Sequence, residues 1–481
     1  MHMLRRFVFL ASLAACLCSE ALALTPQEAD ARLKMAMQIA RESNKRSLVR
    51  EVEEAQREIG RIFKRTKPDG ADEVLRAVEV KVGIDPGGWT MAGQPLFFPK
   101  PEMMEKYKAT GPKLEAAMKS DDAAAVRAVT AEMLAILGDQ AGVPDGRRAG
   151  VKVQAKTFTE ADATKLFADA MKSEAAKFSA LSEGKPMPDQ MARFYAYVLE
   201  GAVTIRPFIE KHQPADLATM DMLTRGLAGI LVAMQQPEGH FPFPDLRGKN
   251  IRFGDMTTKA LAEGKVVVRD GWITTVDPNG GSQFDTGLAG SALLLAGEQH
   301  KNDEWKRAGL RAADWALGQP CCANFNYNAF SVSLLANAAR ITGDAKYLDG
   351  ALRKFRVGVA PGQAPNGRWL DAHNARSVYH LIILRALGDL STALPAEKRR
   401  EVDAVAKPAI RAMLDEFDAM GLTVEALPEL VTLAKIYTDD TRLAAAVRTM
   451  AASLIAKCTD GTRVKMGASP HQLAALPLAA K

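Results

Sequence analysis

Two short stretches with the same small residues, Gly226-Leu-Ala-Gly229 and Gly287-Leu-Ala-Gly290, decide how this chain folds. Each continues into a nearly uninterrupted apolar run, Ile230 to Met234 in the first case and Ala292 to Ala296 in the second. A helix that is apolar on nearly all sides is buried on every side. These stretches therefore predict helices that pack closely against several neighbours.

More amphipathic helices alternate with the apolar ones. Asp303 to Leu317 is an example, and the alternation continues as far as Lys457. Polar landmarks at the starts of the apolar helices recur every 43 to 47 residues. Repeats of that length are typical of stacked two-helix units that share one core. We therefore predict an all-α fold of helical hairpins, with buried helices inside and amphipathic helices outside.

Composition excludes several classes of protein. The chain has 481 residues, of which 47% are hydrophobic and 25% are charged, as in ordinary soluble globular domains. The net charge of +6 is small for this length and comes without a polybasic block. Nucleic acid is therefore not a predicted partner.

The first 23 residues have the pattern of an export signal. Arg5 and Arg6 precede the apolar stretch Phe7 to Cys18, and Ala21-Leu22-Ala23 offers a cleavage site. Leu13-Ala14-Ala15-Cys16 resembles a bacterial lipobox, so a lipid anchor at Cys16 is the alternative. Either way we expect a periplasmic or secreted protein that touches a membrane through that anchor at most.

The cysteines of the mature chain are too few for a framework of disulfide bonds. Cleavage after Ala23 leaves Cys321, Cys322 and Cys458. Exported proteins usually pair their thiols, but three cysteines cannot all pair within one chain. One disulfide from Cys458 to either of the vicinal pair fits the sequence, and no spacing typical of a metal site accompanies them. A buried core must therefore hold the fold together.

A loop and the segment after it carry a resemblance to known enzymes. Gln236-Pro-Glu-Gly-His-Phe-Pro-Phe-Pro-Asp245 resembles the Gln-x-Pro-x-Gly-Gly-x-Pro loop of toroidal pectate lyases, with His240 in place of the second Gly. Ile251-Arg-Phe-Gly-Asp255 is similar to the Ile-Thr-Phe-Asn-Asp of that family. The helical pattern over residues 215–457 resembles the (α/α) toroids of six-hairpin glycosidases and polysaccharide lyases. The resemblance implies a toroid domain over 213–481, after a helical N-terminal region over 24–212.

A small β-hairpin is expected between two of the helices. Lys265-Val-Val-Val-Arg-Asp-Gly-Trp272-Ile-Thr-Thr has alternating strand-type residues around Asp270-Gly271, which is a favoured two-residue turn. Such a hairpin would stand at the rim of a cleft and bring Arg269 and Trp272 to it.

Polar and aromatic residues gather where the apolar helices begin. In a toroid these ends share one face, and analogy between folds places the substrate there. Together with the hairpin, they give the predicted substrate-binding residues, namely Glu238, His240, Asp245, Arg269, Trp272, Asn326, Tyr327, Asn328 and Trp369.

The densest group lies between Trp369 and His380. On a helix, His373, Arg376 and His380 would share one face, at i, i+3 and i+7. Cleavage of a uronate polymer by β-elimination needs a group that neutralises the carboxylate, a base for the C5 proton and an acid for the leaving oxygen. Toroidal alginate and glycosaminoglycan lyases use Asn, His, Arg and Tyr, and the present set is similar in type. The resemblance implies Tyr379 or His380 as base or acid, with Asn374 and Arg376 neutralising the uronate.

Two other functions fit the same residues. Glycoside hydrolysis needs two facing carboxyl groups, and Asp285 and Asp371 are the predicted pair, although each also suits a helix N-cap. The complete predicted catalytic set is therefore Tyr379, His380, His373, Asn374, Arg376, Asp285 and Asp371. A non-catalytic helical-repeat protein that holds a glycan or a protein is the third alternative. The expected partner is a polysaccharide or oligosaccharide, and the expected cofactor is none, or Ca²⁺ between carboxylates such as Asp245 and Asp255.

Overall fold

The structure is a computed structural model of the chain. It describes residues 26–42, 46–64, 70–82, 101–144, 157–248, 251–269, 271–273, 282–420, 426–460, 463–464, 466 and 468–480. The predicted signal segment, Cys16 and Asp270 lie outside the described residues. Export and lipidation therefore stay predictions.

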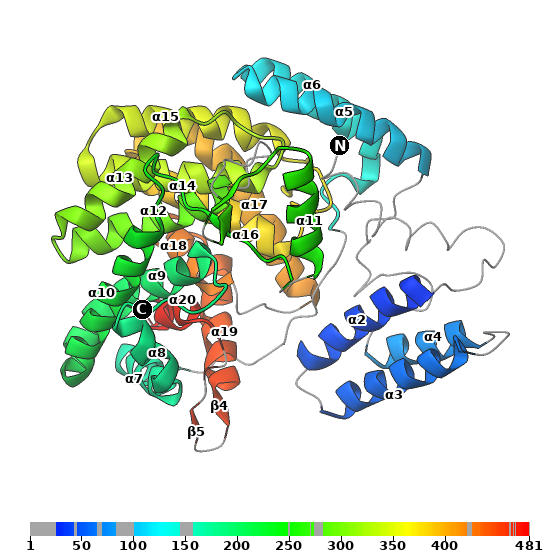
Figure 1. Ribbon diagram of the computed structural model, residues 1–481, viewed down its shortest axis with the longest axis horizontal. Coiled ribbons are helices and arrows are strands. Elements are labelled where there is room, and N and C mark those ends of the chain that lie inside the picture. Colours follow the sequence, from blue (N-terminus) through cyan, green and yellow to red (C-terminus); the bar gives the residue numbers. More distant parts are fainter. Residues whose placement is uncertain are drawn as a thin grey trace.

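Helices make up most of the described chain, which confirms the all-α prediction with a small β insertion. The first group is α2 (Pro26–Glu42), α3 (Arg46–Ile62) and α4 (Ala71–Lys81). These three helices share an apolar cluster around Leu33, Val52 and Leu75. Figure 1 shows them in blue as a group beside the larger body of the molecule.

The larger body contains two layers of helices. The inner helices are α9 (Ala192–His212), α12 (Ser282–Gln299), α14 (Phe325–Thr342), α16 (Ser377–Ala393), α18 (Leu427–Ile436) and α20 (Pro470–Ala474). The outer helices are α7 (Glu160–Ser173), α10 (Leu217–Met234), α13 (Asp303–Gly318), α15 (Ala345–Gly358), α17 (Arg400–Met420) and α19 (Thr441–Cys458).

The inner helices contact one another in a closed order. Helix α9 packs against α12, α12 against α14, α14 against α16, α16 against α18, α18 against α20, and α20 against α9. Each outer helix packs against an inner one, as α13 does against α12 and α15 against α14. We call this closed series the inner ring.

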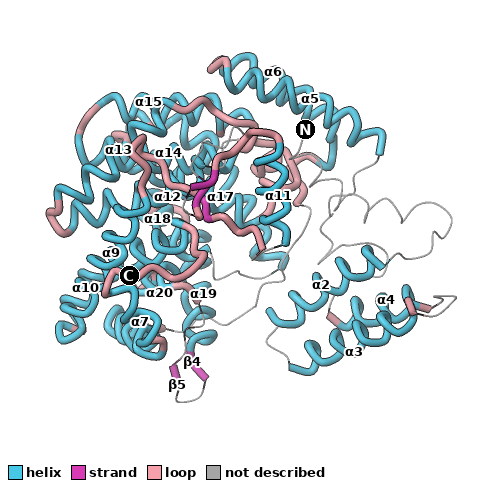
Figure 2. The backbone as a smooth tube through the Cα atoms, viewed as in Figure 1, coloured by secondary structure: helices cyan, strands magenta, loops and turns pink. Residues whose placement is uncertain are grey.

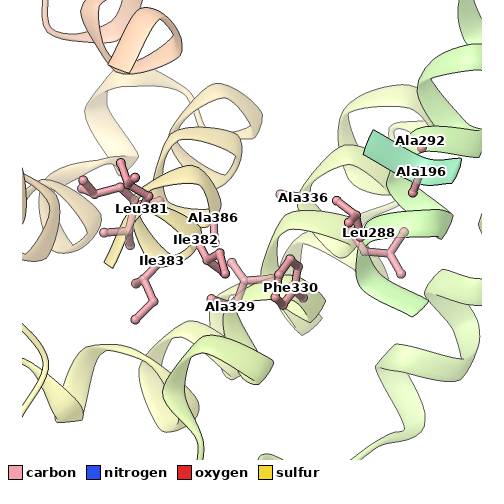
Figure 3. Packing of buried hydrophobic residues seen from close by; sticks show 14 of the residues in the cluster. Ala196, Leu288, Ala292, Ala329, Phe330, Ala336, Leu381, Ile382, Ile383 and Ala386 are labelled. Atoms are coloured by element: carbon pink, nitrogen blue, oxygen red, sulfur yellow. The ribbon is translucent and has the colours of Figure 1, made fainter. Parts of the chain in front are cut away.

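Small residues on α12 allow the close packing that the sequence predicts. A Cβ atom on Gly287 would lie 2.6 Å from the Cβ of Phe330, which is on α14. On Gly290 it would lie 2.7 Å from the Cβ of Ala312, on α13. Both glycines are thus required by a neighbouring helix. Figure 3 shows the resulting core, in which Leu288 and Ala292 of α12 lie near Ala196 of α9.

The expected boundary between residues 212 and 213 does not separate two cores. One apolar cluster runs from Met104 to Ala479, and α9, just before that boundary, is an inner helix. Conversely α10, which carries Gly226-Leu-Ala-Gly229, is an outer helix whose Gly229 is exposed. The two similar glycine motifs therefore lie in different layers. In α10 the glycine that needs space is Gly226, whose Cβ would meet the backbone of α8 (Ala175–Ser182).

The predicted hairpin is present. Strands β2 (Val268–Arg269) and β3 (Trp272–Ile273) pair in antiparallel fashion, and β3 also pairs with β1 (Phe243–Pro244). The other short elements are α11 (Ile251–Ala262), β4 (Thr459–Asp460), β5 (Arg463–Val464) and α21 (Leu476–Ala479). Figure 2 shows the strands in magenta as two small sheets in a helical chain.

One helix in the described part of the chain, Pro214–Met234, is long and apolar enough to cross a membrane. Half of its apolar window is buried inside the protein. A core helix passes the same test, and the contacts of this helix with α9 and α8 are those of a core helix.

Candidate functional site

The amino-terminal ends of the inner helices α9, α12, α14 and α16 lie close together, as the contacts between their side chains show. Polar or aromatic side chains at these amino-terminal ends contact one another. We call them the rim cluster, which consists of Arg193, Phe284, Asp285, Asn326, Tyr327, Asp371, His373, Asn374 and Tyr379. The sequence predicted that residues at these positions would converge, and it missed Arg193 and Phe284.

The first pair in the rim cluster joins α9 to α12. Arg193 donates from Nε to Oδ1 of Asp285 at 2.9 Å and from Nη2 to Oδ2 at 2.5 Å. Burial alone would lower the pKa of Arg193, but the Asp285 carboxylate outweighs it, so the pKa is raised. The guanidinium also lies 3.8 Å from the ring centre of Phe284. Because both oxygens of Asp285 accept from Arg193, this carboxylate is held as half of an ion pair.

A buried amide network joins α14 to the turn before α16. The Oδ1 atom of Asn374 accepts from the backbone N–H of Asn326 at 3.1 Å and from its Nδ2 at 2.8 Å. Asn374 in turn donates from its backbone N to Oδ1 of Asp371 and from Nδ2 to Oδ2, both at 2.9 Å. Asp371, Asn374 and Asn326 are all buried. These residues therefore fix the shape of the turn, and Asn374 acts as a positioning residue.

This turn changes the predicted geometry. Residues 371–376 form turns and bends, and α16 begins at Ser377. The expectation that His373, Arg376 and His380 share one helical face is therefore wrong. The carboxylate of Asp371 stabilises the turn by accepting from the backbone and the side chain of Asn374.

His373 and Tyr379 lie together at the start of α16. Their ring centres are 4.0 Å apart with an interplanar angle of 31°. Both residues are half-buried, as is Arg376 in the same segment. This pair has the accessibility that a base or an acid needs, and it comes from the predicted catalytic set.

His380 faces the core instead. It is fully buried, its Nε2 lies 2.8 Å from the backbone oxygen of Ala409, and its ring packs against Trp369. Burial and the nearby charge of Arg368 hold the pKa of His380 well below its usual value. Trp369 is also fully buried and donates from Nε1 to the oxygen of Val359. Neither side chain has a surface for a substrate, so we remove both from the candidate site.

The other predicted binding residues are dispersed. Asn328 is fully buried and bonds to backbone atoms of Cys322 and Gly358, so it is structural. Tyr327 is half-buried beside Phe284, and Asn326 belongs to the amide network. His240 is buried and packs against Trp315. Asp245 accepts hydrogen bonds from Arg247. Glu238 and Arg269 are exposed, and Trp272 is half-buried on β3. The pairing of β1 with β3 places Trp272 opposite Pro244, next to the loop that holds Asp245.

Helices α5 (Pro101–Lys119) and α6 (Ala123–Leu137) cover one side of the rim cluster. Gly142, just after this hairpin, donates its backbone N–H to the oxygen of Leu370 at 3.0 Å. On α5, burial and, after it, the charge of Asp371 raise the pKa of Tyr107 well above its usual value. This N-terminal hairpin is thus part of the wall beside the turn that precedes α16.

A second polar group, which the sequence did not predict, lies among the inner helices. We call it the axial cluster, and it consists of Tyr197, Glu200, Ser333, Arg385, Asp389, Glu429 and His471. The signal that would have found it is a charged residue inside an apolar helix, as Glu200 is in α9 and Arg385 is in α16.

Ion pairs hold the axial cluster together. Arg385 donates from both terminal nitrogens to the Glu200 carboxylate, with an Nη1 to Oε2 distance of 2.9 Å. Its Nε lies 3.9 Å from Oδ2 of Asp389, which accepts a hydrogen bond from Ser333. His471 packs against Tyr197 with ring centres 5.6 Å apart. Burial lowers the pKa of His471 to about 3, so its imidazole is neutral at physiological pH.

Burial also raises the pKa of Glu429 from a usual value of 4.5 to about 7. The charge of Arg385 lowers this pKa, and the charges of Glu200 and Asp389 raise it. The folded protein therefore keeps this proton up to a higher pH than the unfolded chain does. It follows that the free energy of unfolding of the wild type falls as the pH rises from the pKa of Glu429 in the unfolded chain towards its pKa in the folded protein, about 7.

We expect Glu429→Gln to be more stable than the wild type by about 2 kcal/mol at about pH 8, because the neutral amide need not ionise. At about pH 5 the advantage should disappear, since the native carboxyl is then protonated. Urea unfolding at the two pH values measures the difference. An advantage of equal size at both would contradict the raised pKa of Glu429.

Cysteine and metal predictions have different outcomes. Cys321, Cys322 and Cys458 are buried and form no disulfide with one another, so the predicted bond is absent among them. In the described part of the chain, no group of three or more His, Cys, Asp or Glu residues is arranged to hold a metal ion. Since Asp245 bonds to Arg247, Ca²⁺ binding there has no geometric support and stays a prediction.

No family model and no curated protein matches this chain. Among solved structures, a chain described as a polysaccharide lyase is similar, with 10% sequence identity and a TM-score of 0.42. The similarity covers 66% of this chain and 96% of that chain.

Proposed function

We propose that this protein is an exported, carbohydrate-active α/α toroid that cleaves a uronate-containing polysaccharide by β-elimination at the rim cluster. The observation that carries the proposal is the half-buried pair of Tyr379 and His373, whose ring centres lie 4.0 Å apart. Two groups that can exchange a proton are what abstraction of the C5 proton and protonation of the leaving oxygen need.

Cations accompany this pair. Arg376 belongs to the same turn, and Arg193 is joined to it through Phe284, Tyr327 and the amide network of Asn326. In the proposed reaction, the guanidinium of Arg376 neutralises the uronate carboxylate and so makes the C5 proton more acidic, since Arg193 is already paired with Asp285. Tyr327 and Phe284 offer aromatic faces beside it. Asn374, which was predicted to neutralise the uronate, instead positions this turn.

The state of the carboxylates supports elimination over hydrolysis. Hydrolysis needs one carboxyl group to give a proton and a second to act on water or on the sugar. Both oxygens of Asp285 accept from Arg193, and both oxygens of Asp371 accept from Asn374. The predicted acid pair is therefore committed to structural bonds.

The test is a product assay. Purified mature protein is incubated with alginate, pectate, hyaluronan and glucuronan, and both ultraviolet absorbance and reducing ends are followed. We expect at least one polymer to give both signals, because β-elimination leaves an unsaturated uronate at each new end. Reducing ends without the absorbance would show hydrolysis and overturn the proposal. Binding without either signal would show a non-catalytic glycan-binding protein.

A further inference from the structure

A buried ion pair joins the turn before α16 to the outer helix α17. Arg368, which precedes the turn, donates from Nη2 to Oε2 of Glu416 on α17, and each side chain is only 7% exposed. The same nitrogen also donates to the backbone oxygen of Ala412 at 3.2 Å. Two opposite charges are costly to bury unless hydrogen bonds satisfy both of them. The other hydrogen bonds of this pair therefore show which part of the chain it holds.

These other bonds go to the two residues on either side of Arg376. Arg368 donates from Nη1 to the backbone oxygen of Ala375 at 2.8 Å. Ser377 donates from Oγ to Oε1 of Glu416 at 2.5 Å. Hydrogen bonds in which one group is charged are stronger than those between neutral groups. We call Arg368, Glu416 and Ser377 the clamp.

The clamp fixes the backbone of Arg376 from both sides. The backbone oxygen of Arg376 accepts from the N–H of Tyr379 at 3.0 Å and from that of His380 at 2.9 Å, at the first turn of α16. The bonds between Asn374 and Asp371 hold the earlier half of the turn. The place of Arg376 relative to α16 therefore depends on the clamp.

Arg376 and the buried residues of the clamp differ in what they can touch. Arg368 and Glu416 are buried, so a polymer does not reach them, whereas Arg376 is half-buried. In the proposed reaction, the guanidinium of Arg376 meets the uronate carboxylate. Displacing a reacting or binding group by about 1 Å can lower a rate by about 10²-fold. Residues that set the place of Arg376 can therefore control the rate without contacting the substrate.

We propose that the clamp positions Arg376 for β-elimination. Arg368, Glu416 and Ser377 hold the backbone of Arg376 so that its guanidinium meets the uronate carboxylate. This role rests on the proposed function, because it requires that Arg376 binds that carboxylate. The three residues act through Arg376, so they are positioning residues and not catalytic ones.

The test uses Ser377→Ala in the full mature chain. This change removes one hydrogen bond and keeps the ion pair, whereas removing Arg368 or Glu416 would leave a buried charge without its partner and threaten folding. Hydrogen–deuterium exchange of peptides that contain residues 371–380 measures the clamp without a substrate. We expect the amides of Tyr379 and His380 to exchange about tenfold faster in Ser377→Ala, since their acceptor is less firmly held.

Two further variants serve as controls for the exchange. Ser377→Thr keeps a hydroxyl and should restore the wild-type exchange rate. Ser182→Ala removes a hydroxyl from another half-buried serine, which donates to the backbone oxygen of Phe178 at 2.8 Å on α8. It should leave exchange over residues 371–380 unchanged.

Kinetics on the cleaved polymer show whether the clamp acts through Arg376. We expect kcat/KM to be about tenfold lower in Ser377→Ala than in the wild type, and close to the wild type in Ser377→Thr. In an Arg376→Ala background, Ser377→Ala should lower kcat/KM by less than about twofold, because the group that it positions is gone. A change that only loosened the fold would lower activity equally in both backgrounds.

The outcomes separate the two proposals. Unchanged exchange in Ser377→Ala would overturn the clamp, even if a polymer is cleaved. Faster exchange with wild-type kcat/KM, or an equal loss in the Arg376→Ala background, would overturn the positioning role and leave the lyase standing. If the wild type gives no unsaturated product from any polymer, the proposed function fails and the positioning role fails with it. The exchange rates would then still show whether the clamp holds the turn.

Discussion

Replacing Glu200 by Ala should lower the free energy of unfolding by about 3–5 kcal/mol. Glu200 and Arg385 both lie inside the inner ring, and the carboxylate accepts from both terminal nitrogens of the guanidinium. An arginine keeps its charge at any accessible pH, and the Glu200 charge raises the pKa of Arg385 further against burial. Removing Glu200 therefore leaves a buried cation without its hydrogen-bonded carboxylate, with Asp389 at 3.9 Å from its Nε as the longer ion pair that stays.

Chemical denaturation of Glu200→Ala against the wild type measures this cost. Glu210→Ala is the matched control, because Glu210 is on the same helix and contacts Arg206 from an exposed position. It should cost less than about 0.5 kcal/mol. The double variant Glu200→Ala/Arg385→Leu should recover part of the loss, since no unpaired charge stays buried. A loss below about 1 kcal/mol in Glu200→Ala would show that Arg385 finds water or another partner.

The apolar pattern was sufficient to predict the hairpin fold from sequence. Whether a helix is buried depends mainly on its own residues. The small and apolar residues of α12 and α14 indicate burial, and both helices are buried along nearly their whole length. The apolar pattern did not show that α10 lies in the outer layer. Its glycine motif matches that of α12, but Gly226 packs against the backbone of α8, whereas Gly287 packs against α14 of the inner ring.

Some of the predicted site residues lie together in the structure, and others are buried or dispersed. Tyr379 and His373 meet at the start of α16, as residues of that segment were expected to. The role of His380 was wrong because a one-residue shift on a helix turns a side chain by roughly 100°, which takes it from the rim to the core. Asn328 and Asn374 have the residue type of a binding group, and their hydrogen bonds to Gly358 of α15 and Asn326 of α14 show them to be structural. The partners of an amide are not encoded in its local sequence.

The axial cluster escaped prediction because its members come from separate helices. A charged residue inside the apolar part of α9 or α16 indicates a buried polar group, but it does not show which residues surround it. Only the closed order of the inner helices brings Glu200, Arg385 and His471 to one place. Long-range packing of this kind follows from topology, which local patterns determine only in part.

Tyr379→Phe should reduce turnover of the cleaved polymer by about 10²–10⁴-fold, the usual loss when a proton-transferring group is removed. The variant keeps the ring that packs against His373 at 4.0 Å, so the start of α16 should keep its shape. The phenol oxygen is what the proposed reaction uses, either as base or as acid. The loss should therefore appear in kcat, while KM changes little, because the missing atom acts in the transition state.

Tyr347→Phe is the matched control for this measurement. Its hydroxyl donates to Oδ1 of Asp314 at 2.9 Å between outer helices α15 and α13, outside the rim cluster. The control loses one hydrogen bond and about 1 kcal/mol of stability, and it should turn over substrate at the wild-type rate. Unfolding curves recorded beside the kinetics show whether both variants are folded at the assay temperature. Wild-type kcat in folded Tyr379→Phe would remove Tyr379 from the chemistry and leave His373 as the group that exchanges the proton, which His373→Gln then tests at the same site.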